Sequence, residues 1–83
     1  LGVEPGTPAA RVLNVIGQYQ PLNVVDITPD NVSSLGNSSE PLSEATCKAA
    51  FMYLQLMSCI EIYAGNQVGV NPIVNKLVKA LTG

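Results

Sequence analysis

The stretch that decides the fold is Ser43–Gly65, which reads SEATCKAAFMYLQLMSCIEIYAG. Between Ala49 and Ile60 it contains no charged residue, and apolar side chains occupy most positions. Successive residues of a helix turn by about 100°, so a helix over this stretch points apolar side chains in every direction. We therefore expect a long helix over residues 43–64, with Ser43 as its N-cap, that has to be covered on all sides.

Three dipeptides predict further helix starts: Thr7-Pro8, Thr28-Pro29 and Asn71-Pro72. Each places an N-cap oxygen before a proline, and proline at the first helical position loses no intrahelical hydrogen bond. The segment at residues 65–70, with two glycines, is predicted to be a linker. The chain is thus predicted to be one all-α domain over residues 1–83, a bundle of four to five helices. The predicted helices cover residues 8–20, 29–35, 43–64 and 72–82.

Composition excludes several functions. The chain has 83 residues, of which 12% are charged, with four basic side chains, a net charge of −2 and no histidine. Four scattered basic residues cannot neutralise a nucleic-acid backbone. The longest apolar run is too short for a membrane helix. Without histidine the commonest general base is missing, so we expect no enzyme. We also expect no cofactor or metal, because the two cysteines lack a second pair of metal ligands.

The long apolar helix predicts a homodimer, because two of the other three helices are short and cannot cover it. A second copy of the chain would supply the missing cover, and twofold dimers are the commonest oligomers. Two alternatives remain open at this point: a monomeric bundle that covers its own helix, and a lipid-like ligand that fills the gap. The expected dimer core is Phe51, Leu54, Met57 and Ile60.

The two cysteines, Cys47 and Cys59, are twelve positions apart. On one helix they would lie about 18 Å apart along the axis, too far for a disulfide to each other. Cys59 is expected to be a small core residue. Cys47 would lie in the first helical turn, where the helix dipole lowers the pKa of a thiol. It is either paired with a second chain or a buried free thiol, and the residues alone do not decide between them.

The order of these segments resembles the non-repetitive C-terminal domain of spider silk proteins, the spidroins. PAARV at residues 8–12 resembles that family's first helix, and NSSEPLSEATC at residues 37–47 resembles its serine-rich stretch before a cysteine. A nearly aliphatic helix then ends at Gly65, eighteen positions after the cysteine. The Val68-Gly69 step and LVKALTG at residues 77–83 resemble the family's linker and closing helix.

The resemblance implies an intertwined, parallel homodimer in which the last helix swaps onto the partner. It implies an intermolecular disulfide at Cys47, secretion into the silk gland and fibre, and control of solubility and fibre assembly by salt, pH and shear. The charge pattern departs from the family, since Arg11 is the only arginine and Lys48 follows the cysteine where an acid is usual. A capture-spiral or glue-type silk therefore fits better than dragline.

Arg11 is expected to reach Glu44 or Glu61 in a salt bridge, whereas Lys48 lies one turn from Glu44 and predicts a weak i,i+4 pair.

The rival function from another class is a small secreted helical protein that binds an apolar ligand or lipid between its helices.

Overall fold

The expected N-caps Thr7, Thr28 and Ser43 are confirmed. The computed structural model describes residues 3–4, 6–36 and 40–72. Helix α1 spans Pro8–Tyr19, α2 spans Pro29–Leu35 and α3 spans Glu44–Leu56. Each helix begins after a Thr or Ser whose side-chain oxygen accepts a backbone N–H of the first turn, and α1 and α2 have proline in the first turn.

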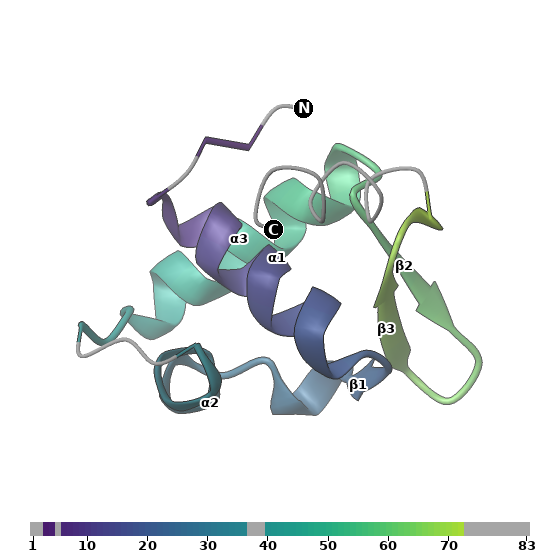
Figure 1. Ribbon diagram of the computed structural model, residues 1–83, viewed down its shortest axis with the longest axis horizontal. Helices are drawn as coiled ribbons and strands as arrows, with labels where there is room; N and C mark the ends of the chain where they lie inside the picture. Colours follow the sequence, from purple (N-terminus) through teal and green to yellow (C-terminus); the bar gives the residue numbers. More distant parts are fainter. Residues whose placement is uncertain (1–2, 5, 37–39, 73–83) are drawn as a thin grey trace.

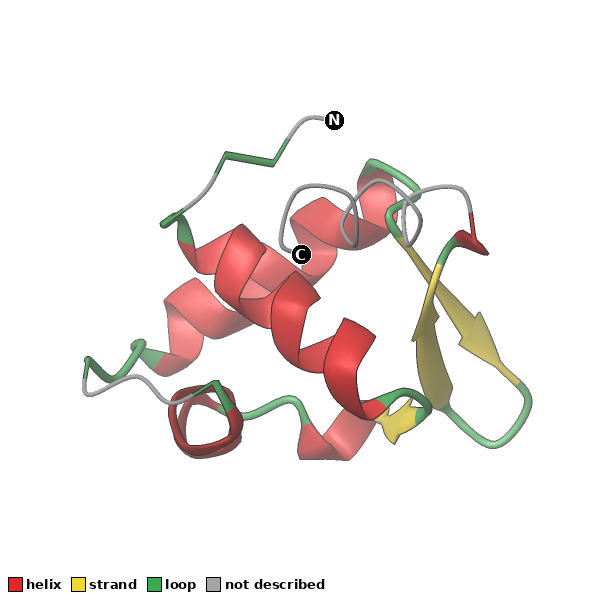
Figure 2. Cartoon of the chain, viewed as in Figure 1, coloured by secondary structure: helices red, strands yellow, loops and turns green. Residues whose placement is uncertain are grey.

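The predicted all-α bundle is wrong, because the chain is an α+β domain (Figures 1 and 2). Residues predicted as the end of the long helix form strand β2, Ile60–Tyr63, and the predicted linker forms β3, Gln67–Val70. With β1, Leu22–Asn23, they make an antiparallel sheet in the order β1-β3-β2. A short 3₁₀ turn, Val24–Asp26, follows β1. The predicted helix over 72–82, and with it the swapped segment, lies outside the described residues beyond Pro72.

Helix α3 ends at Leu56 because the chain makes a Schellman motif there. The N–H of Cys59 donates to the carbonyl oxygen of Leu54 at 2.9 Å, and the N–H of Ser58 donates to that of Gln55 at 3.0 Å. These two bonds satisfy carbonyl groups that the helix end leaves without partners. Ser58 has φ +59°, the left-handed conformation that the motif requires. The turn redirects the chain, so that Ile60 starts a strand instead of another helical turn.

A three-residue loop, Ala64–Asn66, joins β2 to β3. Two of its residues have positive φ, Gly65 at +78° and Asn66 at +61°, and glycine and asparagine tolerate this region best. The register pairs Tyr63 with Gln67 and Ile60 with Val70. On β3, Val68 and Val70 face the core, and the ring of Tyr63 lies over Gly69 on the opposite face.

Helix α1 is the central element of the core. It contacts α3, α2 and β3, and Figure 1 shows it crossing in front of α3, with the sheet to one side. The side chain of Gln20 connects the C-terminal end of α1 to β3, since the Oε1 of Gln20 accepts the N–H of Val70 at 2.9 Å. Buried side chains from all these elements form one cluster: Val12, Leu13, Val15, Ile16, Val32, Cys47, Ala50, Leu54, Cys59, Ile60, Val68 and Val70.

Candidate interaction surface and cavity

Helix α3 buries only one side and exposes the other. Its buried residues, Cys47, Ala50 and Leu54, recur at three- and four-residue spacing and pack in the core. The opposite side carries Ala45, Ala49, Met52 and Leu56, all of them exposed; we call these four residues the outer stripe. The side chain of Leu56 is 81% exposed and that of Met52 is 60% exposed. Among the described residues, α3 therefore presents an apolar helix face that is exposed to water.

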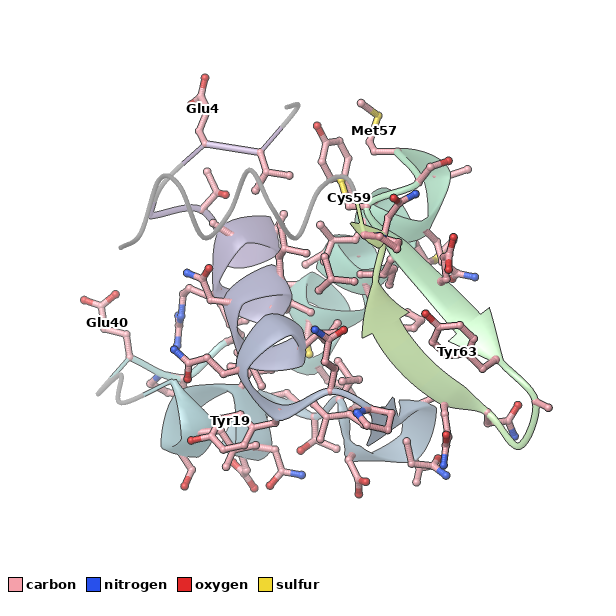
Figure 3. All side chains as sticks on the ribbon, turned by 45° about the vertical axis from the view of Figure 1, so that its right-hand side comes forward. Glu4, Tyr19, Glu40, Met57, Cys59 and Tyr63 are labelled. Atoms are coloured by element: carbon pink, nitrogen blue, oxygen red, sulfur yellow. The ribbon has the colours of Figure 1, made fainter. Side chains whose placement is uncertain are left out.

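Further apolar groups border the outer stripe at the C-terminal end of α3. Met57 is 48% exposed, and Figure 3 shows it pointing away from the body of the domain. Met52, Gln55 and Leu56 line a depression of about 290 Å³ on this side of the helix. The apolar surface thus continues from the middle of α3 to its end.

The predicted dimer core is divided between this surface and the chain's own interior. Leu54 and Ile60 are buried in the core of the single chain, and Phe51 is half-buried against it. Of the four predicted residues, Met57 is the one that is exposed, over about half of its surface. The 3- and 4-residue spacing of the outer stripe was readable in the sequence, but which side of an all-apolar helix faces the core depends on tertiary packing.

Cys47 is a buried free thiol with 2% of its surface exposed. Its Sγ lies 3.8 Å from the carbonyl oxygen of Ile27, to which the thiol donates. Burial raises the pKa of Cys47 above its ordinary 9.0, opposite to the expected effect of the helix dipole. A disulfide to a second chain would need this sulfur to leave the core. Cys59 is also free and buried, as expected of a core residue.

The expected salt bridge from Arg11 to an acidic residue of the long segment is replaced by other contacts. The Arg11 Nη2 donates to the carbonyl oxygen of Glu40 at 2.6 Å and to the Oγ of Ser33 at 3.4 Å. Glu44 instead pairs with Lys48, 3.7 Å away, which confirms the predicted i,i+4 pair. The carboxylate of Glu61 accepts the hydroxyl of Tyr63 at 3.3 Å. Arg11 therefore ties α1 to α2 and to the segment before α3.

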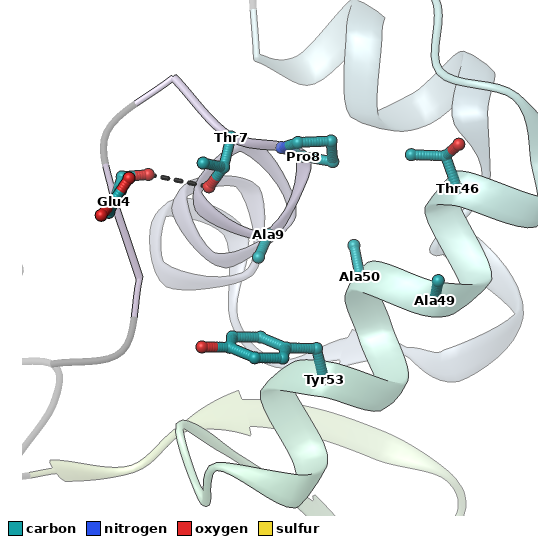
Figure 4. Close-up of a pocket in the computed structure, with 8 residues that line it drawn as sticks. All are labelled: Glu4, Thr7, Pro8, Ala9, Thr46, Ala49, Ala50 and Tyr53. Carbon is teal, nitrogen blue, oxygen red and sulfur yellow. Dashed lines mark hydrogen bonds between the residues drawn. The ribbon is translucent and has the colours of Figure 1, made fainter.

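A cavity of about 630 Å³ opens between the start of α1 and the middle of α3 (Figure 4). Its lining is mainly apolar, with Glu4 and the ring of Tyr53 at its sides. Thr7 holds the segment before α1 in place, since its Oγ1 donates to the carbonyl oxygen of Glu4 at 2.7 Å and accepts the N–H of Ala10 at 3.2 Å. The sequence analysis did not find this cavity, because residues 4–9 have no pattern of a binding motif. The described residues that line it are Glu4, Thr7, Pro8, Ala9, Thr46, Ala49, Ala50 and Tyr53.

Within residues 3–4, 6–36 and 40–72, no three Cys, Asp or Glu side chains lie close enough together to hold a metal ion. Over the same residues, no helix has the length and apolar character needed to cross a membrane. Comparisons of the chain with protein-family models, with curated proteins and with solved structures find no match.

Proposed function

We propose that this domain is a non-enzymatic assembly module that pairs with a second copy of itself through the outer stripe of α3. The observation that carries the proposal is the exposure of Met52 and Leu56 at the centre and end of a well-packed helix. An exposed apolar patch bordered by polar residues is typical of a protein interaction site. The stripe carries no charge, so two copies can approach without desolvating an ion.

The resemblance to the spidroin C-terminal domain supports the same proposal from a different direction. A terminal domain of that kind would be secreted, would join long silk chains in pairs and would tie their solubility and assembly to conditions in the duct. The association proposed here is non-covalent, because Cys47 lies in the core. The proposed association does not depend on the predicted all-α architecture, which was wrong because the chain contains an antiparallel sheet.

Two matched substitutions test this function. Leu56→Lys puts a cation into the stripe, at the C-terminal end of α3, where the helix dipole favours positive charge, so the fold should persist. Val25→Lys makes the same change in charge at a residue that is 74% exposed and lies in the 3₁₀ turn, away from the stripe. In sedimentation velocity we expect Leu56→Lys to weaken self-association at least tenfold and Val25→Lys to leave it within twofold. Equal effects of both variants would refute a dimer face on α3.

A second candidate function is supported by the cavity between α1 and α3. Its volume of about 630 Å³ lies within the ~300–1,000 Å³ range of small-molecule sites, and its lining is largely apolar. An apolar ligand or lipid could occupy it. Thr46→Phe would fill the cavity from α3 and would replace none of the four residues of the outer stripe, of which only Ala49 also lines the cavity. Binding of a fluorescent fatty acid that is lost in this variant, in a chain that stays monomeric, would favour the ligand-binding function over assembly.

A further inference from the structure

Strand β2 lies at one edge of the sheet (Figure 1). The strand order β1-β3-β2 places β3 in the centre and leaves one long side of β2 without a neighbouring strand among the described residues. An edge strand carries a row of backbone N–H and C=O groups that can pair with another strand. Residues 60–63 contain no lysine or proline, which commonly prevent such pairing at an edge.

Two hydrogen bonds at the end of β3 show how the backbone groups of the sheet are directed. The N–H of Val70 points away from β2, because it donates to the Oε1 of Gln20 at 2.9 Å. The N–H of the next residue, Asn71, points toward the side of β2 and donates to the carbonyl oxygen of Cys59 at 2.9 Å. In an antiparallel pair, residues that bond to the neighbouring strand alternate with residues that do not.

The register of β2 and β3 carries this alternation along β2. Glu61 and Tyr63 are in step with Cys59, so their N–H and C=O groups point to β3. Ile60 and Ile62 alternate with them, and their N–H and C=O groups therefore point away from the sheet. Ile62 is 43% exposed, so the outer edge is accessible at this residue.

We propose that this edge binds an extended segment of another protein, which pairs antiparallel with β2 as a fourth strand and places an apolar residue opposite Ile62 and a basic residue opposite Glu61. Ile62 and the residue opposite it exchange two backbone hydrogen bonds, as in the strand addition that many peptide-binding domains use. The edge is separate from the outer stripe of α3, and this inference does not depend on the assembly function proposed above.

The side chains on the two faces of β2 specify the partner. Ile62 lies on the same face as the buried Ile60, and an apolar residue opposite Ile62 would cover its exposed part. Glu61 lies on the other face with Tyr63, whose hydroxyl donates to the Glu61 carboxylate at 3.3 Å. Opposite charges across a strand pair are favourable, and like charges directly opposite are destabilising. A lysine or arginine opposite Glu61 is therefore preferred, and an acidic residue is disfavoured.

A peptide titration followed by amide NMR shifts tests the proposal. The probe is the capped peptide Thr-Val-Lys-Val-Thr, whose first valine is placed opposite Ile62 and whose lysine is placed opposite Glu61. It is added to the labelled parent chain at about 50 μM in excess reductant. We expect the largest shift at the amide of Ile62 and a dissociation constant of about 0.1–1 mM. N-methylation of the first valine, whose N–H faces β2, should weaken binding at least fivefold, whereas N-methylation of the lysine, whose N–H faces away, should leave it within twofold.

A charge reversal on the chain tests the side-chain contact. The parent should prefer the lysine peptide at least threefold over the same peptide with glutamate, and Glu61→Lys should reverse this preference. Asp26→Lys makes the same change of charge at an exposed residue of the 3₁₀ turn and should keep the preference of the parent. Equal binding of both peptides by all three chains would refute the basic partner residue.

Three results would overturn the edge as a site for another protein. The first is no binding of the lysine peptide at about 5 mM, and the second is a set of shifts confined to residues outside β2. The third is a shift of the Ile62 amide when the chain alone is concentrated, which would assign the edge to a second copy. None of them bears on the outer stripe, which the Leu56→Lys variant tests separately.

Discussion

Replacing Ser58 with glycine should stabilise the domain, and the sign of this effect tests where α3 ends. Ser58 has φ +59° and is exposed, so the substitution changes the backbone preference and removes no buried contact. The left-handed conformation costs an L-residue roughly 1–2 kcal/mol, and the extra freedom of glycine in the unfolded chain offsets roughly 0.5–1 kcal/mol of the gain. We expect Ser58→Gly to raise the free energy of unfolding by about 0.5–1 kcal/mol.

The opposite result is expected if the long helix continued to Gly65. Ser58 would then lie inside a helix, where glycine is about 0.5 kcal/mol less favourable than serine. Ser34→Gly is the matched control, because Ser34 is exposed on α2. There the substitution should lower the free energy of unfolding, as expected for glycine inside a helix.

Urea unfolding measures the difference. For a slope near 1 kcal/mol/M, the midpoint of Ser58→Gly should rise by roughly 0.5–1 M with an unchanged slope, while that of Ser34→Gly should fall. A lower midpoint for Ser58→Gly would refute the Schellman motif and the strand that follows it.

Three further predictions concern packing and burial. Gly17→Ala should stabilise the domain by up to about 1 kcal/mol, since a Cβ there would lie 3.7 Å from the Cγ2 of Val70 and would favour the helix; an unchanged or lower melting temperature would contradict this. Gly36→Ala should destabilise it by about 1–3 kcal/mol, because its Cβ would lie 2.8 Å from the carbonyl oxygen of Val32, and a melting temperature equal to that of the parent would refute the close approach. Burial raises the pKa of both thiols above 9.0, so the folded state holds these protons more tightly than the unfolded state. Their contribution to stability is complete below pH ~9 and is lost as the pH rises through the folded-state values, so the urea midpoint should fall above pH ~9, and a chain with both cysteines replaced by alanine should lose part of that slope.

The helix starts could be predicted from the sequence because neighbouring residues determine them. A Thr or Ser side chain that accepts an N–H three residues later, followed by proline or an acidic residue, acts within a single turn. The N-caps at Thr7, Thr28 and Ser43 were therefore predicted correctly, as was the pair between Lys48 and Glu44.

The end of α3 could not be predicted in the same way. Its Schellman motif uses Ser58, whereas glycine is the usual sequence signal, and the apolar run continues past it without a break. The Gly65-Asn66 pair between two short runs with β-branched residues was a readable hairpin signal that we interpreted as a linker. β1 pairs with residues about 45 positions later in the chain, and no local pattern indicates so distant a partner.

The site was predicted only in part for a related reason. The sequence indicates that the segment after Ser43 is strongly apolar, and among the described residues Met52 and Leu56 of this segment are exposed. Which residues remain outside depends on where α1 packs, and α1 packs on Cys47, Ala50 and Leu54. The thiol and the leucine therefore lie in the core, and Met52 and Leu56 form the candidate surface.

The most direct test of the central claim is the molar mass of the unmodified chain as a function of concentration. Sedimentation equilibrium in excess reductant, from about 10 μM to 1 mM, removes any contribution of a disulfide. We predict a reversible rise from the 8.7 kDa of one chain toward twice that mass over this range, in line with a weak helix–helix contact. A folded chain that keeps the mass of a monomer at every concentration would contradict the claim that the outer stripe of α3 joins two copies.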